Sequence, residues 1–246
     1  MRMVQCAILA SVAMMVASCQ SESGITPGEA QELLAEVRAI RQELHLLNAR
    51  PQPQAASAPR RPESLSLSVN GRPTLGRADA KLTIVEFTDY QCPYCKAFKE
   101  TTLVDLKRDY VDTGVAKLVV YDLPLPNHPL APKAAEAGRC AGDQGKYWEM
   151  HDQLFADSQR LAVQELKSYA DAVGLDQARF SECLDGGKFT EHLRQDVSKA
   201  MELGVGGTPT FVLGREDNGN VSGKVIRGAQ PLASFQMEIE RLLSAN

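Results

Sequence analysis

The residues best suited to chemistry are two cysteines separated by a Pro-Tyr pair, Cys92-Pro93-Tyr94-Cys95. They follow a short apolar segment and precede a helical pattern, which predicts that Cys92 lies at a helix N-terminus. Free N–H groups and the helix dipole stabilise an anion there, and the thiolate is the form of cysteine that attacks disulfides. Pro93 suits the first helical turn because its missing N–H would have no intrahelical partner. We therefore expect Cys92 to be a nucleophile and Cys95, one turn on, to close a disulfide with it.

A Cys-x-x-Cys pair has two other common uses, which are half of a zinc site and a static structural disulfide. Zinc would need a second matching pair, and the remaining cysteines Cys140 and Cys183 lie far apart with no ligand-like spacing. A structural disulfide would not need Pro93 and a helix start. Both alternatives explain less of the motif than a redox-active pair does.

Two further features could serve the same site. Glu86 stands in the middle of an apolar strand, Leu82–Phe87, where a carboxylate is costly unless it is used. A buried acid there could accept the Cys95 proton, whereas on an edge strand it would simply face solvent. The Thr208-Pro209 bond precedes another strand, can be cis, and would present main chain to an extended substrate beside the sulfurs. Alone, this proline would be an ordinary turn residue.

The elements that would position these residues follow an α/β order. Strands are expected at 82–87 and 115–122, and a helix from the cysteine motif to about Tyr110 joins them. Helices are expected over about 129–203, with breaks at Gly174 and Gly186-Gly187. Two strands follow at 210–213 and 224–227 around a turn over 216–223, and a helix over 232–243 comes last. This order predicts a thioredoxin-like α/β fold with an inserted helical subdomain.

Composition and charge describe an ordinary globular protein. The 246 residues are 43% hydrophobic and 24% charged, values typical of a chain with a proper core. Lys and Arg number 27 against 31 Asp and Glu, a net charge of −4, so the basic excess of a nucleic-acid-binding domain is missing. Six cysteines are too few for a small disulfide-stapled scaffold.

The N-terminus predicts export. Residues 1–18 carry an early positive charge, a short apolar run and small residues at the end, as a secretory signal peptide does. The run is shorter than the roughly 20 residues that a membrane span needs. Residues 16–19, Val-Ala-Ser-Cys, resemble the lipobox of bacterial lipoproteins, which implies acylation of Cys19 and a lipid anchor on the cell envelope. In an ordinary cleaved signal, Cys19 would be incidental.

Residues 19–49 are predicted to be a polar tether followed by a coiled-coil-like helix from about 28 to 48. Its apolar residues recur at spacings of four and three, as in a heptad repeat: Leu33, Val37, Ile40, Leu44 and Leu47. Glu36 and Arg41 could form an ion pair between parallel helices, so we expect a homo-oligomer. The repeat spans less than three heptads, and a helix that packs on its own domain or on the membrane is the alternative. The Pro-rich residues 50–65 predict an extended linker, and the catalytic domain spans 66–246.

Together these motifs resemble the DsbA-like branch of the thioredoxin superfamily over residues 66–246. The similar segments are Ile84–Phe87, Cys92–Cys95, Gly207–Thr210 and the helical stretch Cys140–Asp152. The resemblance implies that Cys92 is the nucleophile, Cys95 the resolving thiol and Glu86 the buried acid. It also implies that Thr208 and Pro209 form a cis-proline loop beside them.

The resemblance has further implications for the cysteines. Related insertions often carry a cysteine pair, which implies a structural disulfide between Cys140 and Cys183; two free thiols are the alternative. Pro93-Tyr94 departs from the Pro-His pair of strongly oxidising members, which leaves the redox direction open.

The function implied by the resemblance is thiol–disulfide exchange with cysteines of unfolded or misfolded exported proteins. It needs no cofactor beyond the redox-active cysteine pair, and a membrane protein would restore its redox state. An oxidase donates its disulfide, whereas an isomerase or reductase works from the dithiol and gains from several sites facing one client. The heptad helix favours the isomerase or reductase slightly. A thiol-dependent binding module or holdase is the alternative from another class.

Overall fold

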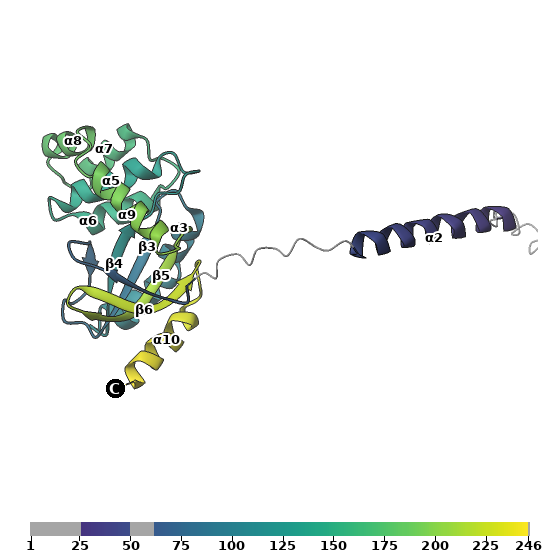
Figure 1. Ribbon diagram of the computed structural model, residues 1–246. Coiled ribbons are helices and arrows are strands. Elements are labelled where there is room, and N and C mark those ends of the chain that lie inside the picture. Colours follow the sequence, from purple (N-terminus) through teal and green to yellow (C-terminus); the bar gives the residue numbers. More distant parts are fainter. Residues whose placement is uncertain (1–25, 50–61, 246) are drawn as a thin grey trace, which may run out of the picture. The chain divides into compact units, whose positions relative to one another are not determined.

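The computed structural model describes residues 26–49 and 62–245 (Figure 1). These residues form two units that divide after residue 60. The predicted signal peptide 1–18, the predicted lipidation site Cys19 and most of the predicted linker 50–65 lie outside the described residues. Within the described ranges, no helix is both long enough and apolar enough to cross a membrane.

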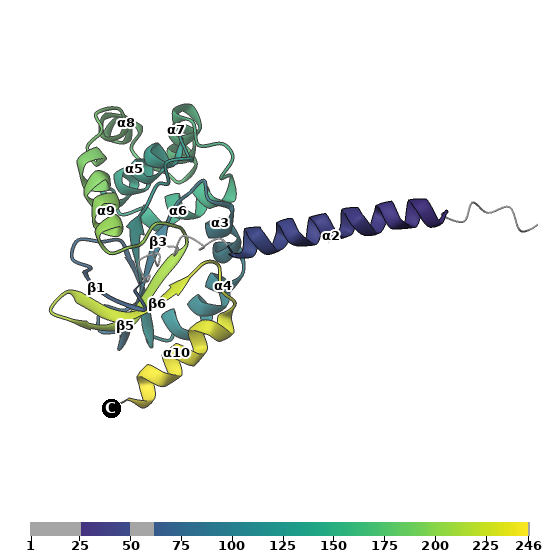
Figure 2. The ribbon, with the colours of Figure 1, turned by 45° about the vertical axis from the view of Figure 1, so that its right-hand side comes forward.

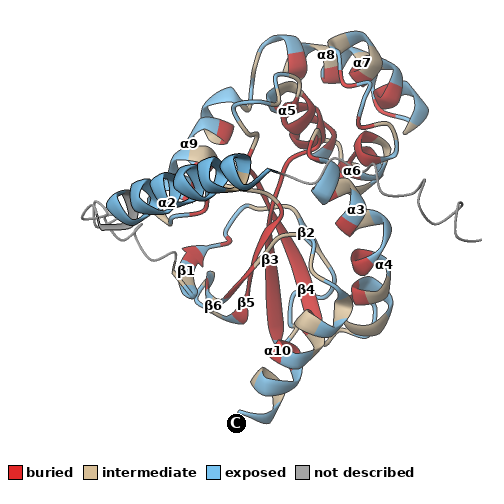
Figure 3. Ribbon diagram, turned by 90° about the vertical axis from the view of Figure 1, so that its right-hand side faces the viewer, coloured by how far each residue is buried: buried red, intermediate tan, exposed pale blue. Residues whose placement is uncertain are grey.

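The larger unit is built on a mixed six-stranded sheet in the order β1-β6-β5-β3-β4-β2. The strands are β1 (Ser64–Ser68), β2 (Thr74–Leu75), β3 (Leu82–Thr88), β4 (Ala116–Asp122), β5 (Thr210–Asp217) and β6 (Asn220–Arg227). β3 and β4 are parallel, and all other neighbours are antiparallel. Every residue of β3 and β4 is buried (Figure 3), and their β-branched and aromatic side chains suit such a strand.

Helices cover both faces of the sheet. They are α3 (Pro93–Glu100), α4 (Thr102–Leu106), the short π-helix η1 (Lys107–Val111), α5 (Ala131–Gly142), α6 (Tyr147–Ala156), α7 (Val163–Ala172), α8 (Gln177–Asp185), α9 (Thr190–Glu202) and α10 (Leu232–Ser244). On one face, Phe98 of α3 and Phe235 of α10 pack against Ile84 of β3. On the other face, Ala200 of α9 packs against Phe87. β3 is therefore enclosed from both sides.

The helices α5 to α8 gather at one end of the sheet, and α10 lies toward the other end (Figures 1 and 2). Helices α5 to α8 have an apolar core of their own, which includes Leu154, Phe155 and Phe180. Cys92 and Cys95 belong to this core, although the strand before them and the helix after them belong to the sheet layer. The cysteine pair therefore lies where the two cores meet.

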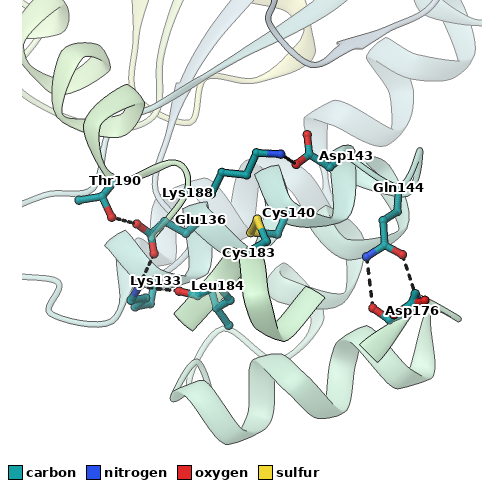
Figure 4. The surroundings of a disulfide bond; sticks show 10 residues. All are labelled: Lys133, Glu136, Cys140, Asp143, Gln144, Asp176, Cys183, Leu184, Lys188 and Thr190. Atoms are coloured by element: carbon teal, nitrogen blue, oxygen red, sulfur yellow. Dashed lines mark hydrogen bonds and ion pairs between the residues drawn. A yellow bond between two sulfur atoms is a disulfide. The ribbon is translucent and has the colours of Figure 1, made fainter. Parts of the chain in front are cut away.

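A disulfide joins Cys140 of α5 to Cys183 of α8 (Figure 4), the pairing that the resemblance implied. Polar contacts surround it: Lys188 pairs with Asp143, Glu136 contacts Lys133 and Thr190, and Gln144 hydrogen-bonds to the main chain of Asp176 (Figure 4). The bond closes a loop with a sequence separation of 43, which on the chain-entropy model contributes up to about 4 kcal/mol. It ties two helices of the insertion together.

The predicted helix from the cysteine motif to Tyr110 is wrong in one respect, because it is broken. α3 ends before Thr101, whose φ and ψ are −121° and −86°. The Thr101 hydroxyl donates a hydrogen bond to the carbonyl of Ala97 at 2.7 Å, and such bonds from threonine to the preceding turn bend helices. α4 and η1 then follow as separate helical segments.

The predicted turn over 216–223 is also wrong. β5 and β6 extend through most of it and pair up to Asp217 and Asn220. The actual turn is Asn218-Gly219, with φ of 49° and 74°, as in the tight two-residue turns that fit the twist of a hairpin. β1, whose start at Ser64 lies inside the predicted linker, pairs with the extended β6.

In the smaller unit, the described residues 26–49 contain the helix α2 (Pro27–Ala49). Its N-terminus is a capping box, in which the Thr26 N–H donates to the Glu29 carboxylate at 2.8 Å and the Glu29 N–H donates to Thr26 Oγ1 at 3.3 Å. Four side chains of the predicted heptad row are about half exposed: Leu33 49%, Val37 52%, Ile40 57% and Leu44 55%. This unit therefore carries a row of exposed apolar side chains.

Candidate active site

Cys92 is the residue immediately before α3, and Pro93 is the first residue of the helix. The φ and ψ of Cys92, −73° and 119°, are those of extended main chain. The Cys92 carbonyl accepts a hydrogen bond from the Lys96 N–H at 3.1 Å. Within the described residues, Cys92 and Cys95 are the two free cysteines. Cys95 is fully enclosed and Cys92 is 3% exposed, whereas Tyr94 between them is 67% exposed. Cys92 is therefore the sulfur nearer to a client.

The two thiols have opposite acidities. The pKa of Cys92 falls to about 5, chiefly because it accepts a hydrogen bond from the Cys95 thiol; Thr208 and the N–H groups of Cys95 and Tyr94 lower the pKa further, and burial opposes them. The pKa of Cys95 is raised, first by burial, then by its hydrogen bond to Cys92 and by the Glu86 carboxylate. At neutral pH the pair therefore holds one thiolate, on Cys92, and one thiol, on Cys95.

The loop before β5 lies against Cys92. The Thr208-Pro209 peptide bond is cis, and the Thr208 carbonyl oxygen lies 3.5 Å from the Cys92 sulfur. Two hydrogen bonds hold this loop: the Thr210 hydroxyl donates to the Gly207 carbonyl at 2.7 Å, and the Gly228 N–H donates to the Pro209 carbonyl at 2.8 Å. Residues far apart in the sequence thus meet at the Cys92 sulfur.

Glu86 is a buried acid, as predicted, because β3 lies between β5 and β4 rather than at the edge of the sheet. The residue is 2% exposed, and its Oε2 has no hydrogen-bond partner among the residues that the structure describes. Burial raises the pKa of Glu86 to about 7, and the neighbouring Thr88 side chain and then the Lys99 ammonium oppose this. An acid with this pKa can hold or release a proton near neutral pH.

Lys99 connects this acid to the surface. It lies on α3, and its ammonium forms an ion pair with Asp152 of α6 at 3.0 Å. Lys99, Asp152 and the buried His151 line a hollow of about 330 Å³. The charge that acts on Glu86 is therefore itself in reach of solvent.

Three polar residues that the sequence analysis did not single out fix the start of α3. The buried carboxylate of Asp89 accepts hydrogen bonds from the N–H groups of Gln91 and Leu125, both at 2.7 Å, and lies 2.8 Å from His128 Nδ1. The Gln91 side-chain oxygen accepts from the N–H groups of Leu130 and Ala131 at the start of α5, at 2.6 and 3.0 Å. Asp89 and Gln91 lie in the turn that follows β3, and polar residues in turns often hydrogen-bond to nearby main chain. This position is the sequence feature that could have indicated their role.

The arrangement fits thiol chemistry. It combines a stabilised thiolate, a second thiol in contact with it, a buried acid and an adjoining main-chain loop. Among the residues described, no three His, Cys, Asp or Glu side chains gather as metal ligands.

The family model described as Thioredoxin (Thioredoxin_4) matches residues 68–240. The chain belongs to this thioredoxin family. The matched part of this thioredoxin-family chain contains the cysteine pair, Glu86 and the cis-proline loop.

Individual curated relatives match only part of the chain. A Salinispora arenicola protein named Na(+)/H(+) antiporter NhaA 1 is 38% identical over 156 residues, which are 63% of this chain and 23% of that protein. The chain thus spans about a quarter of the length of the curated relatives of this kind. The probable disulfide bond formation protein D of Bacillus anthracis is 29% identical over 164 residues, 61% of this chain and 70% of that protein.

Among solved structures, Wolbachia pipientis alpha-DsbA1 superposes with a TM-score of 0.65 over 72% of this chain and 94% of that chain, at 23% identity. This likeness shows the fold. The predictions of a thioredoxin-like fold with inserted helices and of membership in the thioredoxin superfamily are confirmed.

The first testable consequence concerns the Cys92 thiolate. In the reduced protein, alkylation of Cys92 by iodoacetamide should rise with pH around a midpoint near 5, because its pKa lies at about 5. Peptide mapping by mass spectrometry at several pH values measures this site by site. The same protein in denaturant is the control, where Cys92 should react with a midpoint near 8.5. A folded-state midpoint near 8.5 would contradict the assignment.

The second consequence concerns Glu86. Its folded pKa of about 7 lies above the ordinary glutamate value of 4.5, so between these values the native state binds more protons and loses stability as the pH rises. The stabilising contribution is complete below about pH 4.5 and lost above about pH 7. Glu86→Gln removes this dependence, so its stability relative to wild type should increase by roughly 2–3 kcal/mol from pH 4.5 to pH 8.

Urea unfolding of the reduced proteins at both pH values measures the difference. Glu240→Gln, at an exposed position of α10, is the matched control and should show no such change. A difference between wild type and Glu86→Gln that does not depend on pH would refute the role of burial.

Proposed function

We propose that the protein is a thiol–disulfide oxidoreductase that acts on cysteines of exported proteins. The observation that carries the proposal is the stabilised Cys92 thiolate at the start of α3, 3.5 Å from the Thr208 carbonyl of the cis-proline loop. The similarity to a probable disulfide bond formation protein supports it. The reaction needs no bound cofactor, because the two cysteine sulfurs carry the two electrons.

In the oxidising direction, a client thiolate attacks Cys92 of the Cys92–Cys95 disulfide. A mixed disulfide forms between the client and Cys92, and Cys95 leaves as a thiolate that takes a proton from Glu86. A second client thiolate then attacks the client sulfur of the mixed disulfide and releases the Cys92 thiolate. The client loses two electrons and forms one disulfide, and the protein gains both electrons as a dithiol. The isomerase or reductase begins with attack of the Cys92 thiolate on a client disulfide.

For the direction, two observations favour different enzymes. The exposed apolar row of α2 supports the isomerase or reductase, which gains from an assembly of several sites. The low pKa of Cys92 supports the oxidase, because a stabilised dithiol makes the disulfide a stronger oxidant. The reduction potential of the pair distinguishes them: a value near about −120 mV indicates an oxidase, and one well below about −180 mV a reductase or isomerase.

We also propose that the protein is exported and anchored to a membrane through acylated Cys19, as the lipobox-like residues 16–19 suggest. Its partners would be unfolded or misfolded exported proteins with cysteines, and a membrane protein that restores its redox state. The matched antiporters contribute no activity to this proposal, since the chain spans only about a quarter of them.

The test of the reaction is to trap its intermediate. With Cys95→Ser the resolving thiol is lost, so the Cys92 thiolate should attack a disulfide-linked cysteine peptide, release one peptide thiolate and accumulate as a mixed disulfide with the other peptide. Non-reducing electrophoresis and mass spectrometry of the adduct measure it. Cys92→Ser is the control and should give no adduct with the enclosed Cys95. An adduct of equal yield in both variants, or in neither, would rule out the proposed mechanism.

Self-association through α2 is tested separately. Replacement of Val37 and Leu44 by Asp puts charge into the apolar row and should convert the oligomer into a monomer in sedimentation velocity. Leu46→Asp is the matched control, because Leu46 is 65% exposed and lies outside the row. A monomeric wild-type protein would contradict the proposed oligomer. If Leu46→Asp had the same effect as the double variant, the proposed role of the heptad row would be wrong.

A further inference from the structure

Lys96, which lies on α3 one turn after Cys92, is held by partners on two helices. Its ammonium donates hydrogen bonds to the carbonyl oxygens of Phe155 and Ala156 at 2.6 and 3.3 Å and forms an ion pair with Glu100 at 2.6 Å. An ammonium has three N–H groups, so these three acceptors use all of them. The Lys96 side chain is 29% exposed, and its charged end is therefore directed at fixed partners.

Two of these acceptors belong to the last turn of α6. Carbonyl groups in the last turn of a helix have no N–H partner within the helix, and a cation there interacts favourably with the helix dipole. α6 belongs to the helical insertion, whereas α3 packs on the sheet, and the two helices contact each other (Figures 2 and 3). The Lys96 side chain therefore crosses the boundary between the two cores.

The same end of α6 also touches the chain before Cys92. The buried ring of Phe155 packs against the buried ring of Tyr90, with ring centroids 4.9 Å apart, and Tyr90 precedes Cys92 by two residues. On the other side, the Lys96 N–H donates to the Cys92 carbonyl at 3.1 Å. Phe155 is thus connected to both ends of the segment that contains Cys92, through its ring on one side and its carbonyl on the other.

This segment supplies the donors to the Cys92 sulfur. They include the N–H groups of Tyr94 and Cys95 in the first turn of α3. Contacts at both ends of the segment hold these groups toward the sulfur. Because Glu100 pairs with the Lys96 ammonium at 2.6 Å, Lys96 acts on the site through the position of the helix rather than through its charge.

We propose that Lys96 is a positioning residue for thiol–disulfide exchange, which holds the first turn of α3 against the last turn of α6 so that the Cys92 sulfur keeps its hydrogen-bond donors. This inference rests on the proposed oxidoreductase function and deepens it. Lys96 takes no part in the exchange of sulfur bonds. Its contribution is to make the reactivity of Cys92 depend on the helical insertion.

The test is Lys96→Met in the full chain, with Lys96→Arg as the conservative variant. Without the link to α6, the pH midpoint of Cys92 alkylation by iodoacetamide should rise by about one unit, because the first-turn donors are no longer held toward the sulfur. Lys96→Arg keeps several N–H donors and should stay near the wild-type midpoint. The rise should be the same at about 0.05 M and about 1 M NaCl, since salt screens a direct charge effect but not a positional one.

Lys133→Met is the matched control. Lys133 lies on α5, donates a hydrogen bond to the Leu184 carbonyl in the last turn of α8 at 2.9 Å, and pairs with Glu136 on its own helix (Figure 4). It therefore makes the same kind of helix cap between two helices of the insertion. Lys133→Met should lower the urea midpoint of unfolding, as Lys96→Met does, and should leave the alkylation midpoint of Cys92 unchanged.

The outcomes separate this proposal from the proposed function. A wild-type alkylation midpoint in Lys96→Met overturns the positioning role, as does an equal rise in Lys133→Met or in Lys96→Arg. A rise that disappears at high salt also overturns it, because it indicates a direct effect of charge. Alkylation does not require disulfide exchange, so these results leave the oxidoreductase function untouched. Failure of Cys95→Ser to trap a mixed disulfide overturns that function instead.

Discussion

The chemistry of the site depends on where α3 begins. A sulfur that is 3% exposed would normally be a poor place for negative charge, since burial penalises the thiolate. Here the Cys95 thiol and the N–H groups of the first helical turn stabilise the anion, and the pKa of Cys92 falls to about 5. If the helix began one residue earlier or later, these donors would point at another atom. The register of α3 is therefore the constraint that the surrounding structure must hold.

That register is fixed by contacts between the two cores. Asp89 and Gln91 lie in the turn between β3 and α3. The Asp89 side chain accepts a hydrogen bond from the Leu125 N–H, and the Gln91 side chain accepts hydrogen bonds from the N–H groups of Leu130 and Ala131. Because the last two begin α5, the start of the catalytic helix is tied to the start of the insertion. The insertion is thus part of the active-site framework, and a disulfide joins two of its helices.

Local patterns carried most of what could be predicted from the sequence. Cys92 stands out because it and Cys95 form a thiol pair at a predicted helix start, and Glu86 stands out because it is an acid inside an apolar strand. Both features lie within ten residues of each other. The roles of Asp89, Gln91 and His128 depend on partners 36 to 40 residues away, so no local spacing displays them. The break at Thr101 lies in its φ and ψ of −121° and −86°, which a periodic pattern of apolar residues does not encode.

The two buried groups beneath the nucleophile depend on each other. Cys95 must remain a thiol to donate its hydrogen bond to Cys92, yet in the proposed reaction it must lose its proton when it attacks the mixed disulfide. Burial meets the first requirement by raising the pKa of Cys95. The same burial raises the pKa of Glu86 to about 7, which makes this carboxylate a base strong enough to take that proton near neutral pH. An acid with no partner for Oε2 is costly inside a sheet, and the proton transfer proposed for Glu86 would account for a cost that packing alone does not explain.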